Sequence, residues 1–261
     1  MGPMSRPTRL TLPKGWRDLV VQFVVLAIAL FIYQLGRGLA DGSGNALKFT
    51  AISNAKDLVY VERQLGLYVE PAIQRWALSV PYLDDILSWL YLNVQTTVTL
   101  GGMLWIYLFH NQRYYFVRNM FFASFVLACL LYLAVPTAPP RLMPAEYGFH
   151  DSVESFSGAR KFIWEAFANP YAAVPSMHCG FALMIGLSIA SLVRSRGVRA
   201  FWLAYPAAIL LVVVATGNHF WLDAVAGAAV AAVGAAVATG LARLRPEAWA
   251  WATEQPSRVS P

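Results

Sequence analysis

The chain has 261 residues, of which 58% are hydrophobic and only 13% are charged, whereas soluble domains carry about 25% charged residues. This composition excludes an ordinary soluble domain and is typical of a membrane protein. The formal net charge of +6 does not indicate nucleic-acid binding, because the arginines lie between apolar runs and form no basic stripe. Two cysteines are too few for a disulfide framework.

Six apolar runs are long enough to cross about 30 Å of hydrocarbon. They cover residues 19–40, 85–109, 116–135, 174–193, 199–216 and 221–242. A basic flank precedes the first run, but no cleavage site for a signal peptide follows it, so we expect a retained span. The sequence therefore predicts an all-α integral membrane bundle of six transmembrane helices. It forms one domain, 19–242, between an N-terminal tail (1–18) and a C-terminal tail (243–261).

The last apolar run is rich in alanine, glycine and valine. Small residues allow two helix backbones to approach closely in a membrane. The pattern that includes Gly227, Ala231 and Gly234 therefore predicts a packing surface, on a helix inside the bundle.

Basic residues predict the orientation of the spans. With a cytoplasmic N-terminus, the inner segments hold 12 of the 20 basic residues but only three of the 14 acids. We therefore expect an integral plasma-membrane protein with both termini in the cytoplasm. The segments before the fourth span and before the sixth span then lie at the outer face.

Two outer segments are long. Residues 41–84 place Leu58, Val61 and Leu65 at helical spacing between charges, which predicts an amphipathic helix lying on the membrane interface. Residues 136–173 contain a second candidate amphipathic helix, GARKFIWEAFAN (158–169). A loop of this length in a compact domain is often a lid or a binding element.

The first motif that indicates a catalytic site is GNHFWLD (217–223), at the junction of the last two spans. His219 and Asp223 are four residues apart, which on a helix puts both side chains on one face. A carboxylate bonded to one imidazole nitrogen leaves the other nitrogen free to attack, so His219 is a candidate nucleophile and Asp223 its partner. The alternative is a buried pair that only satisfies its own hydrogen bonds.

A second motif, VPSMH (174–178), predicts the start of a helix capped by Ser176. Free amides at a helix start favour a phosphate, and His178 beside it could protonate a leaving oxygen. The alternative is an ordinary capped span with an interfacial histidine.

Arg141 lies among prolines that direct its guanidinium, and a guanidinium suits a phosphate. The alternative is an arginine that only extends to the lipid headgroups. Tyr171 and Asn218 are weaker candidates for hydrogen bonding to a phosphate.

The predicted topology brings Arg141, His178 and His219 to the same membrane face. A metal site from His178, Cys179, His219 and Asp223 is disfavoured, because an arginine and a helix start suit an anion better than a cation. We therefore expect no metal and no cofactor.

These motifs together resemble the type-2 phosphatidic acid phosphatase superfamily. The matching stretches are APPRLMP (138–144), AAVPSMHCG (172–180) and GNHFWLDAVAG (217–227), and the resemblance covers residues 20–242. Within the superfamily, the first two stretches are more similar to the inositol phosphorylceramide synthase branch than to the ordinary phosphatases.

The resemblance implies a metal-independent membrane enzyme that forms a phosphohistidine. By motif, His219 is then the nucleophile, Asp223 its partner, His178 the acid for the leaving group, and Arg141 a phosphate ligand. The substrate is then a phospholipid or another lipid phosphate.

The chain departs from the phosphatase pattern at two cationic sites. Ala134 stands where the phosphatases have a lysine, and Val212-Val213 where they have a Ser-Arg pair. Because a phosphodiester carries less charge than a monoester, fewer cations favour transfer of a phosphorylated headgroup to a hydroxyl acceptor lipid. Arg160 or Lys161 could replace a missing cation.

Two alternative functions stay open. One is a lipid phosphate or polyprenyl (di)phosphate phosphatase. The other is a non-catalytic lipid-binding or transport protein, although a transporter would be expected to show repeats.

Overall fold

The computed structural model describes residues 12–40, 44–157 and 170–244, and in these ranges the fold is helical with no strand beyond an isolated bridge between Thr137 and Ala172. The helices are α1 (Gly15–Ala40), α2 (Gly44–Gln64), α3 (Glu70–Ser79), α4 (Leu83–Phe109), α5 (Asn111–Ala134), α6 (Ser152–Ser157), α7 (Met177–Leu192), α8 (Arg196–Ala215) and α9 (Trp221–Leu244). Two short 3-10 helices, η2 (Pro140–Leu142) and η3 (Ala145–Tyr147), lie between α5 and α6.

The six predicted apolar segments are all helical, as α1, α4, α5, α7, α8 and α9. In the described residues, α5, α8 and α9 are long and apolar enough to cross a membrane, which suggests a membrane protein. Helix α7 is apolar but shorter. The six-span arrangement remains a prediction.

Helix α5 begins at Asn111, earlier than the predicted 116, because its polar first turns bind the start of α1. Tyr115 of α5 and Tyr107 of α4 both donate from their hydroxyl groups to Oδ2 of Asp18 in α1, at 3.0 and 2.8 Å. Arg118 donates to Gln22 Oε1 at 2.7 Å. Polar contacts therefore replace apolar ones at this end of the bundle.

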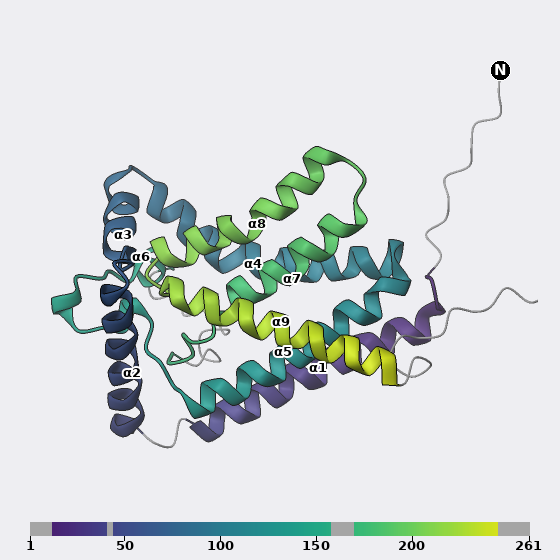
Figure 1. Cartoon of the computed structure of the whole chain (residues 1–261), viewed down its shortest axis with the longest axis horizontal. Helices are drawn as coiled ribbons and strands as arrows, with labels where there is room; N and C mark the ends of the chain where they lie inside the picture. Colours follow the sequence, from purple (N-terminus) through teal and green to yellow (C-terminus); the bar gives the residue numbers. More distant parts are fainter. Residues whose placement is uncertain (1–11, 41–43, 158–169, 245–261) are drawn as a thin grey trace, which may run out of the picture.

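Helix α9 contacts α5 and α7, whereas α2 runs across one end of the bundle (Figure 1). The predicted packing role of the small residues is confirmed. A Cβ at Gly227 would collide with the carbonyl oxygen of Ser176, and a Cβ at Gly234 would collide with Ser124 Oγ. The helix is not enclosed on every side, however, because Val225 is 51% exposed.

Of its predicted apolar stripe, helix α2 uses only Leu58 to contact the rest of the protein. Its Ala51, Ala55 and Val59 are buried in a cluster that includes Phe220. Val61 is exposed, and so is Leu65, which directly follows the helix; Phe49 and Tyr60 of the helix are exposed as well. A face made mostly of small residues lets the helix approach the loop that follows α5. Contact of the exposed residues with a membrane interface remains a prediction.

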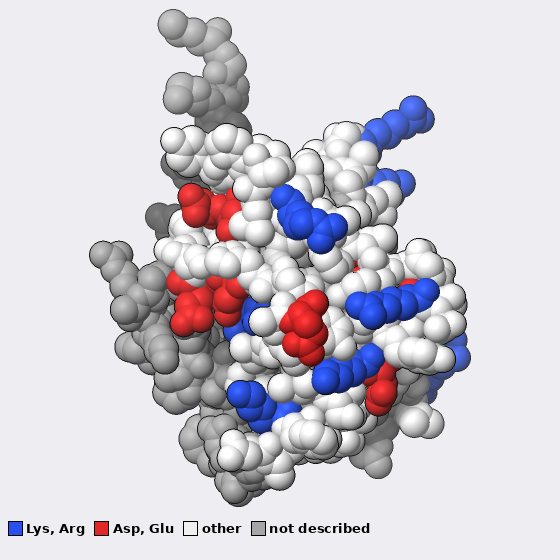
Figure 2. Space-filling view, turned by 90° about the vertical axis from the view of Figure 1, so that its left-hand side faces the viewer, with Lys and Arg blue, Asp and Glu red and all other residues white. Residues whose placement is uncertain are grey.

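Acidic and basic side chains are mixed on the face that carries α2 and α3 (Figure 2), a distribution typical of a surface in water. Asn54 of α2 donates to the carbonyl oxygen of Pro136 at 2.7 Å. In α3, Gln74 both donates to and accepts from the backbone of His150, at 2.9 and 3.0 Å. These two helices thus hold both ends of the loop segment 136–150. The second predicted amphipathic helix, 158–169, lies outside the described residues.

Candidate active site

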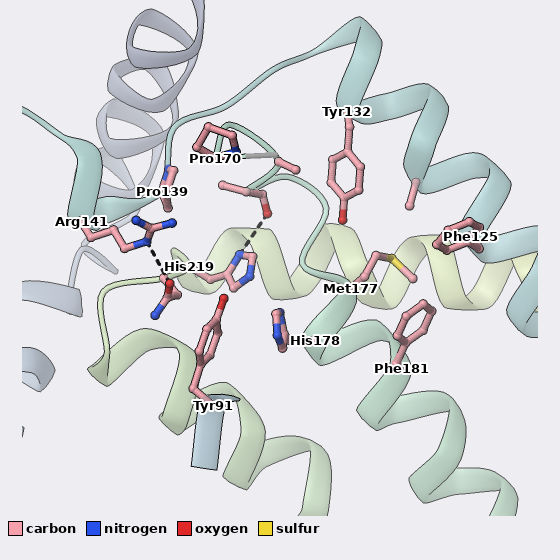
Figure 3. Close-up of a pocket in the computed structure, with 14 residues that line it drawn as sticks. Tyr91, Phe125, Tyr132, Pro139, Arg141, Pro170, Met177, His178, Phe181 and His219 are labelled. Carbon is pink, nitrogen blue, oxygen red and sulfur yellow. Dashed lines mark hydrogen bonds between the residues drawn. The ribbon is translucent and has the colours of Figure 1, made fainter. Parts of the chain in front are cut away.

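A cavity of about 290 Å³ lies where α5, α7 and the loop between α8 and α9 meet. Four of the predicted site residues line it: Arg141, His178, Asn218 and His219. Figure 3 shows Arg141, His219 and His178 around this one cavity, with Tyr91 beside the histidines. The rest of the wall is mostly apolar or aromatic and includes Phe125, Ala128, Tyr132, Met177 and Phe181.

The loop between α8 and α9 turns sharply at Gly217, whose φ is +70°. A left-handed backbone favours glycine, and a Cβ here would also lie 2.7 Å from Gln74 Nε2. After the turn, the amides of Asn218 and His219 both donate to the carbonyl oxygen of Val213, at 3.0 and 3.1 Å. The turn therefore brings Asn218 and His219 back beside the end of α8.

His219 is held through one ring nitrogen. Its Nδ1 lies 3.1 Å from the carbonyl oxygen of Ala173 and 3.2 Å from Asp223 Oδ2. Both partners are acceptors, so they favour the tautomer with hydrogen on Nδ1, which leaves Nε2 with a lone pair. Asp223 is fully buried and is itself fixed by the amide of Phe220, which donates to Oδ2 at 2.9 Å.

The surroundings keep the His219 imidazole neutral. Burial, assisted by the positive charge of Arg141, lowers the pKa of His219 to about 4. At neutral pH the ring therefore carries an unprotonated nitrogen, as a nucleophile requires.

His178 lies in the first turn of α7, where Ser176 caps the helix by accepting from the amide of Cys179 at 3.4 Å. The His178 ring stacks on Tyr91 of α4, with ring centroids 4.7 Å apart and planes at 26°. Its centroid is 5.5 Å from that of His219. The two imidazoles are thus close enough to contact opposite sides of one small group.

Arg141 lies in η2 and is fixed at three points. Its amide donates to the carbonyl oxygen of Gly217 at 2.8 Å, and its Nε donates to Asn218 Oδ1 at 3.0 Å. Its Nη1 forms an ion pair with Asp151 Oδ2 at 3.0 Å. The guanidinium is therefore tied to the loop that carries His219 and is partly neutralised by Asp151.

The description "PAP2 superfamily" belongs to the family model that matches residues 56–237, well over half of the chain. The chain belongs to the PAP2 superfamily. No curated protein and no solved structure matches it. Membership of the PAP2 superfamily suggests lipid phosphatase or phosphotransferase chemistry.

Three predicted site residues of this PAP2-superfamily chain, Asp223, Ser176 and Tyr171, do not line the cavity. Ser176 is fully buried, and its hydroxyl group serves as the helix cap. Tyr171 packs against the buried cluster around Phe220. Ser176 supports the site indirectly, because its amide donates to the carbonyl oxygen of Asp223 at 2.8 Å and joins the start of α7 to α9.

Three residues of the site were missed in the sequence: Tyr91, Tyr132 and Asp151. An aromatic residue in an apolar helix is usually a core residue, so the sequence does not indicate a site role for Tyr91 or Tyr132. Tyr132 lines the cavity and donates its hydroxyl to the carbonyl oxygen of Pro175 at 2.9 Å. Asp151 could have been suspected only because an acid in the arginine's own loop is a natural ion-pair partner.

The positions where other members carry cations hold no charge here. Ala134 ends α5, and Val212 and Val213 are buried in α8. Arg160 and Lys161 lie outside the described residues. In the part of the chain that the structure describes, no group of three or more His, Cys, Asp or Glu side chains is arranged to hold a metal ion.

Proposed function

We propose that this protein is a membrane enzyme that cleaves a lipid phosphoester through a phosphohistidine on His219. One observation carries the proposal: the neutral imidazole of His219, held at Nδ1 by Ala173 and Asp223, lines the same cavity as His178 and Arg141. A nucleophile, a second imidazole and a guanidinium around one cavity are the groups that phosphoryl transfer requires.

In the first step, His219 Nε2 attacks phosphorus. The N–P bond forms as the bond from phosphorus to the leaving oxygen breaks, and protonated His178 gives its proton to that oxygen. An anionic phosphate beside His178 favours its imidazolium form. Arg141 balances the charge of the equatorial oxygens, and Asp223 balances the positive charge that develops on His219.

In the second step, an acceptor hydroxyl attacks the phosphohistidine. His178, now neutral, takes the proton of the hydroxyl, and the N–P bond breaks as the new O–P bond forms. His219 returns to its neutral form. Water in place of the hydroxyl would give hydrolysis, so the acceptor alone separates a transferase from a phosphatase.

We favour transfer of a phosphorylated headgroup from a diester lipid, as in the inositol phosphorylceramide synthase branch. The uncharged side chains of Ala134, Val212 and Val213 support this preference, and so does Asp151, which neutralises part of the charge of Arg141. A monoester carries up to two negative charges and a diester one, so a site with little positive charge suits the diester.

The apolar part of the cavity wall supports a lipid substrate. Phe125 and Ala128 of α5 face the cavity together with Met177 and Phe181 of α7. Acyl chains gain free energy by contact with such surfaces, while the phosphate lies at the polar end beside Arg141. With six spans and cytoplasmic termini, the site opens at the outer face of the plasma membrane.

A labelled phosphodiester lipid, incubated with the purified protein with and without a hydroxyl acceptor lipid, tests the proposal. We expect label to move to the acceptor. We also expect a labelled phosphohistidine on the protein, which survives a low-pH quench only briefly because its N–P bond is acid-labile. Release of inorganic phosphate from a monoester lipid at equal efficiency would instead establish a phosphatase.

A further inference from the structure

The start of α9 is held by carboxylates from three helices. The amide of Phe220 donates to Asp223 Oδ2 at 2.9 Å, that of Trp221 to Glu70 Oε1 at 3.0 Å, and that of Leu222 to Glu62 Oε1 at 3.2 Å. The first amides of a helix have no partner within the helix. Here α2 and α3 supply two of the acceptors, across more than 150 residues of sequence.

The positions of Glu62 and Glu70 disfavour a negative charge on both side chains at once. Glu62 and Glu70 are both fully buried, and the Oε2 atom of each has no hydrogen-bond partner within the described residues. Two ionised carboxylates buried side by side repel each other and lack solvent, so one of them takes up a proton. Burial, and after it the negative charge of Glu70, raises the pKa of Glu62 to about 9.

We propose that Glu62 and Glu70 share one proton and that this pair positions the first turn of α9, and with it His219 and Asp223, for reaction. Glu62 carries the proton on Oε2 and donates it to Glu70 Oε2. This single bond gives a partner to both of the unpaired oxygens. Each Oε1 stays free to accept from the helix.

The pair acts close to the reacting residues without touching the cavity. Glu70 binds the second residue after His219, and Glu62 binds the residue directly before Asp223. The indole of Trp221 also donates to the carbonyl oxygen of Leu67, at 2.8 Å, in the turn between α2 and α3. Neither glutamate lines the cavity, so both are positioning residues.

Tyr68, in the turn between α2 and α3, interacts electrostatically with both glutamates. Within the described residues, the ionisable groups that face Glu62 from other helices are Glu70 on α3 and Asp223 on α9. Both are acids, so a second negative charge on Glu62 would repel both. Loss of the shared proton should loosen the start of α9 and displace Asp223 from His219.

Two substitutions of Glu62 separate the shared proton from simple packing. Glu62→Gln keeps an oxygen for the amide of Leu222 and donates permanently to Glu70, so it mimics the protonated acid. We expect its kcat to stay within about threefold of the native value. Glu62→Leu keeps the volume but removes both bonds, and we expect kcat to fall at least about thirtyfold with KM changed less than threefold.

The pH dependence gives a readout that packing alone would not move. The native kcat should fall as pH rises through about 9, whereas Glu62→Gln should lack this loss. Glu146→Gln, a change on the exposed surface, is the control and should keep the native profile. A Glu62→Gln variant as impaired as Glu62→Leu, or with the native alkaline loss, would refute the proposal.

The kinetic test rests on the proposed function, but stability tests the shared proton without a substrate. Folding takes up a proton on Glu62 between its ordinary pKa of 4.5 and its folded pKa of about 9. The free energy of unfolding should therefore decrease as pH rises across this interval and level off above it.

In detergent, the thermal midpoint of the native protein should fall from pH 5 to pH 9 by at least about 5 °C more than that of Glu62→Gln. If the thermal midpoints of the native protein and of Glu62→Gln fell equally with pH, the shared-proton proposal would be refuted even if lipid transfer occurs. Unequal slopes in a protein with no activity on any phospholipid would retain the pair and reject the proposed reaction.

Discussion

Arg141 donates from Nε to the side-chain oxygen of Asn218, at 3.0 Å, although the two residues are 77 positions apart. Asn218 is adjacent to His219, so the guanidinium and the imidazole belong to one connected unit. Asn218 is in turn oriented by Thr216, whose hydroxyl accepts from Asn218 Nδ2 at 2.9 Å. This connection determines where a phosphate bound to Arg141 would lie relative to His219.

Replacement of the nucleophile should abolish turnover. We expect His219→Ala to lower kcat on the order of 10⁴-fold, because the variant lacks the nitrogen that forms the N–P bond. The variant should trap no phosphohistidine from a labelled lipid. His178→Ala should still form some phosphoenzyme, because it removes only the proton donor. A phosphoenzyme of native yield in His219→Ala would exclude this residue as the nucleophile.

Asp223→Asn tests the orientation of the imidazole. An amide can accept one hydrogen bond through its oxygen but cannot balance a positive imidazole, and its NH₂ group favours the wrong tautomer. We expect kcat to fall by about 10²- to 10⁴-fold, with little change in KM. The measurement is steady-state headgroup transfer, and native kcat in this variant would show that the His219–Asp223 pair is only structural.

Asp151→Asn should change the choice between substrates. The substitution frees Nη1 of Arg141 from a carboxylate, which makes the site more positive. Since both side chains are partly exposed, the effect is modest, and we expect the monoester-to-diester ratio of kcat/KM to rise roughly two- to fivefold. Glu154→Gln, on the exposed side of α6, is the matched control and should leave the ratio unchanged.

The residues that line the site were largely predictable, because polar side chains at the ends of apolar runs are costly and few. Arg141, His178, Asn218 and His219 could be found in this way, and six apolar runs located six helices. Tyr171 and Ser176 do not line the cavity, because the spacing of a motif does not tell which way a side chain faces.

The partners contributed by distant segments could not be predicted. Glu62 and Glu70 read as the polar side of an amphipathic helix, yet both are buried against α9. Only the tertiary fold shows that the amides of Trp221 and Leu222 lie beside them. Likewise, the small-residue face of α2 became visible only through its contact with the loop after α5.

Close packing between α7 and α9 predicts a stability difference between two glycines of one helix. Gly227→Ala would drive a methyl group into the carbonyl oxygen of Ser176, whereas nothing lies within 4 Å of a Cβ at Gly240. We expect Gly227→Ala to destabilise by about 1–3 kcal/mol and Gly240→Ala to stabilise by about 0.5–1 kcal/mol. Thermal unfolding in detergent measures both, and equal midpoints would contradict the close contact.

The pH dependence of phosphoenzyme formation tests the environment of His219. Its pKa is lowered to about 4, so the neutral ring predominates at every pH above that value. The contribution of this residue to the rate should therefore persist well below pH 6.5, the ordinary value for histidine. Single-turnover phosphorylation between pH 4 and 8 measures it, and loss of nucleophile reactivity with a midpoint near 6.5 would argue against a buried imidazole.

The contact of Glu62 and Glu70 with the start of α9 also bears on the order of assembly. Helices α2 and α3 are synthesised early, whereas their partners at Trp221 and Leu222 follow some 150 residues later. Contacts of such long sequence separation form slowly. Until the last helix is synthesised, Glu62 and Glu70 lack these partners and His219 is absent, so the proposed reaction could start only after the bundle is complete.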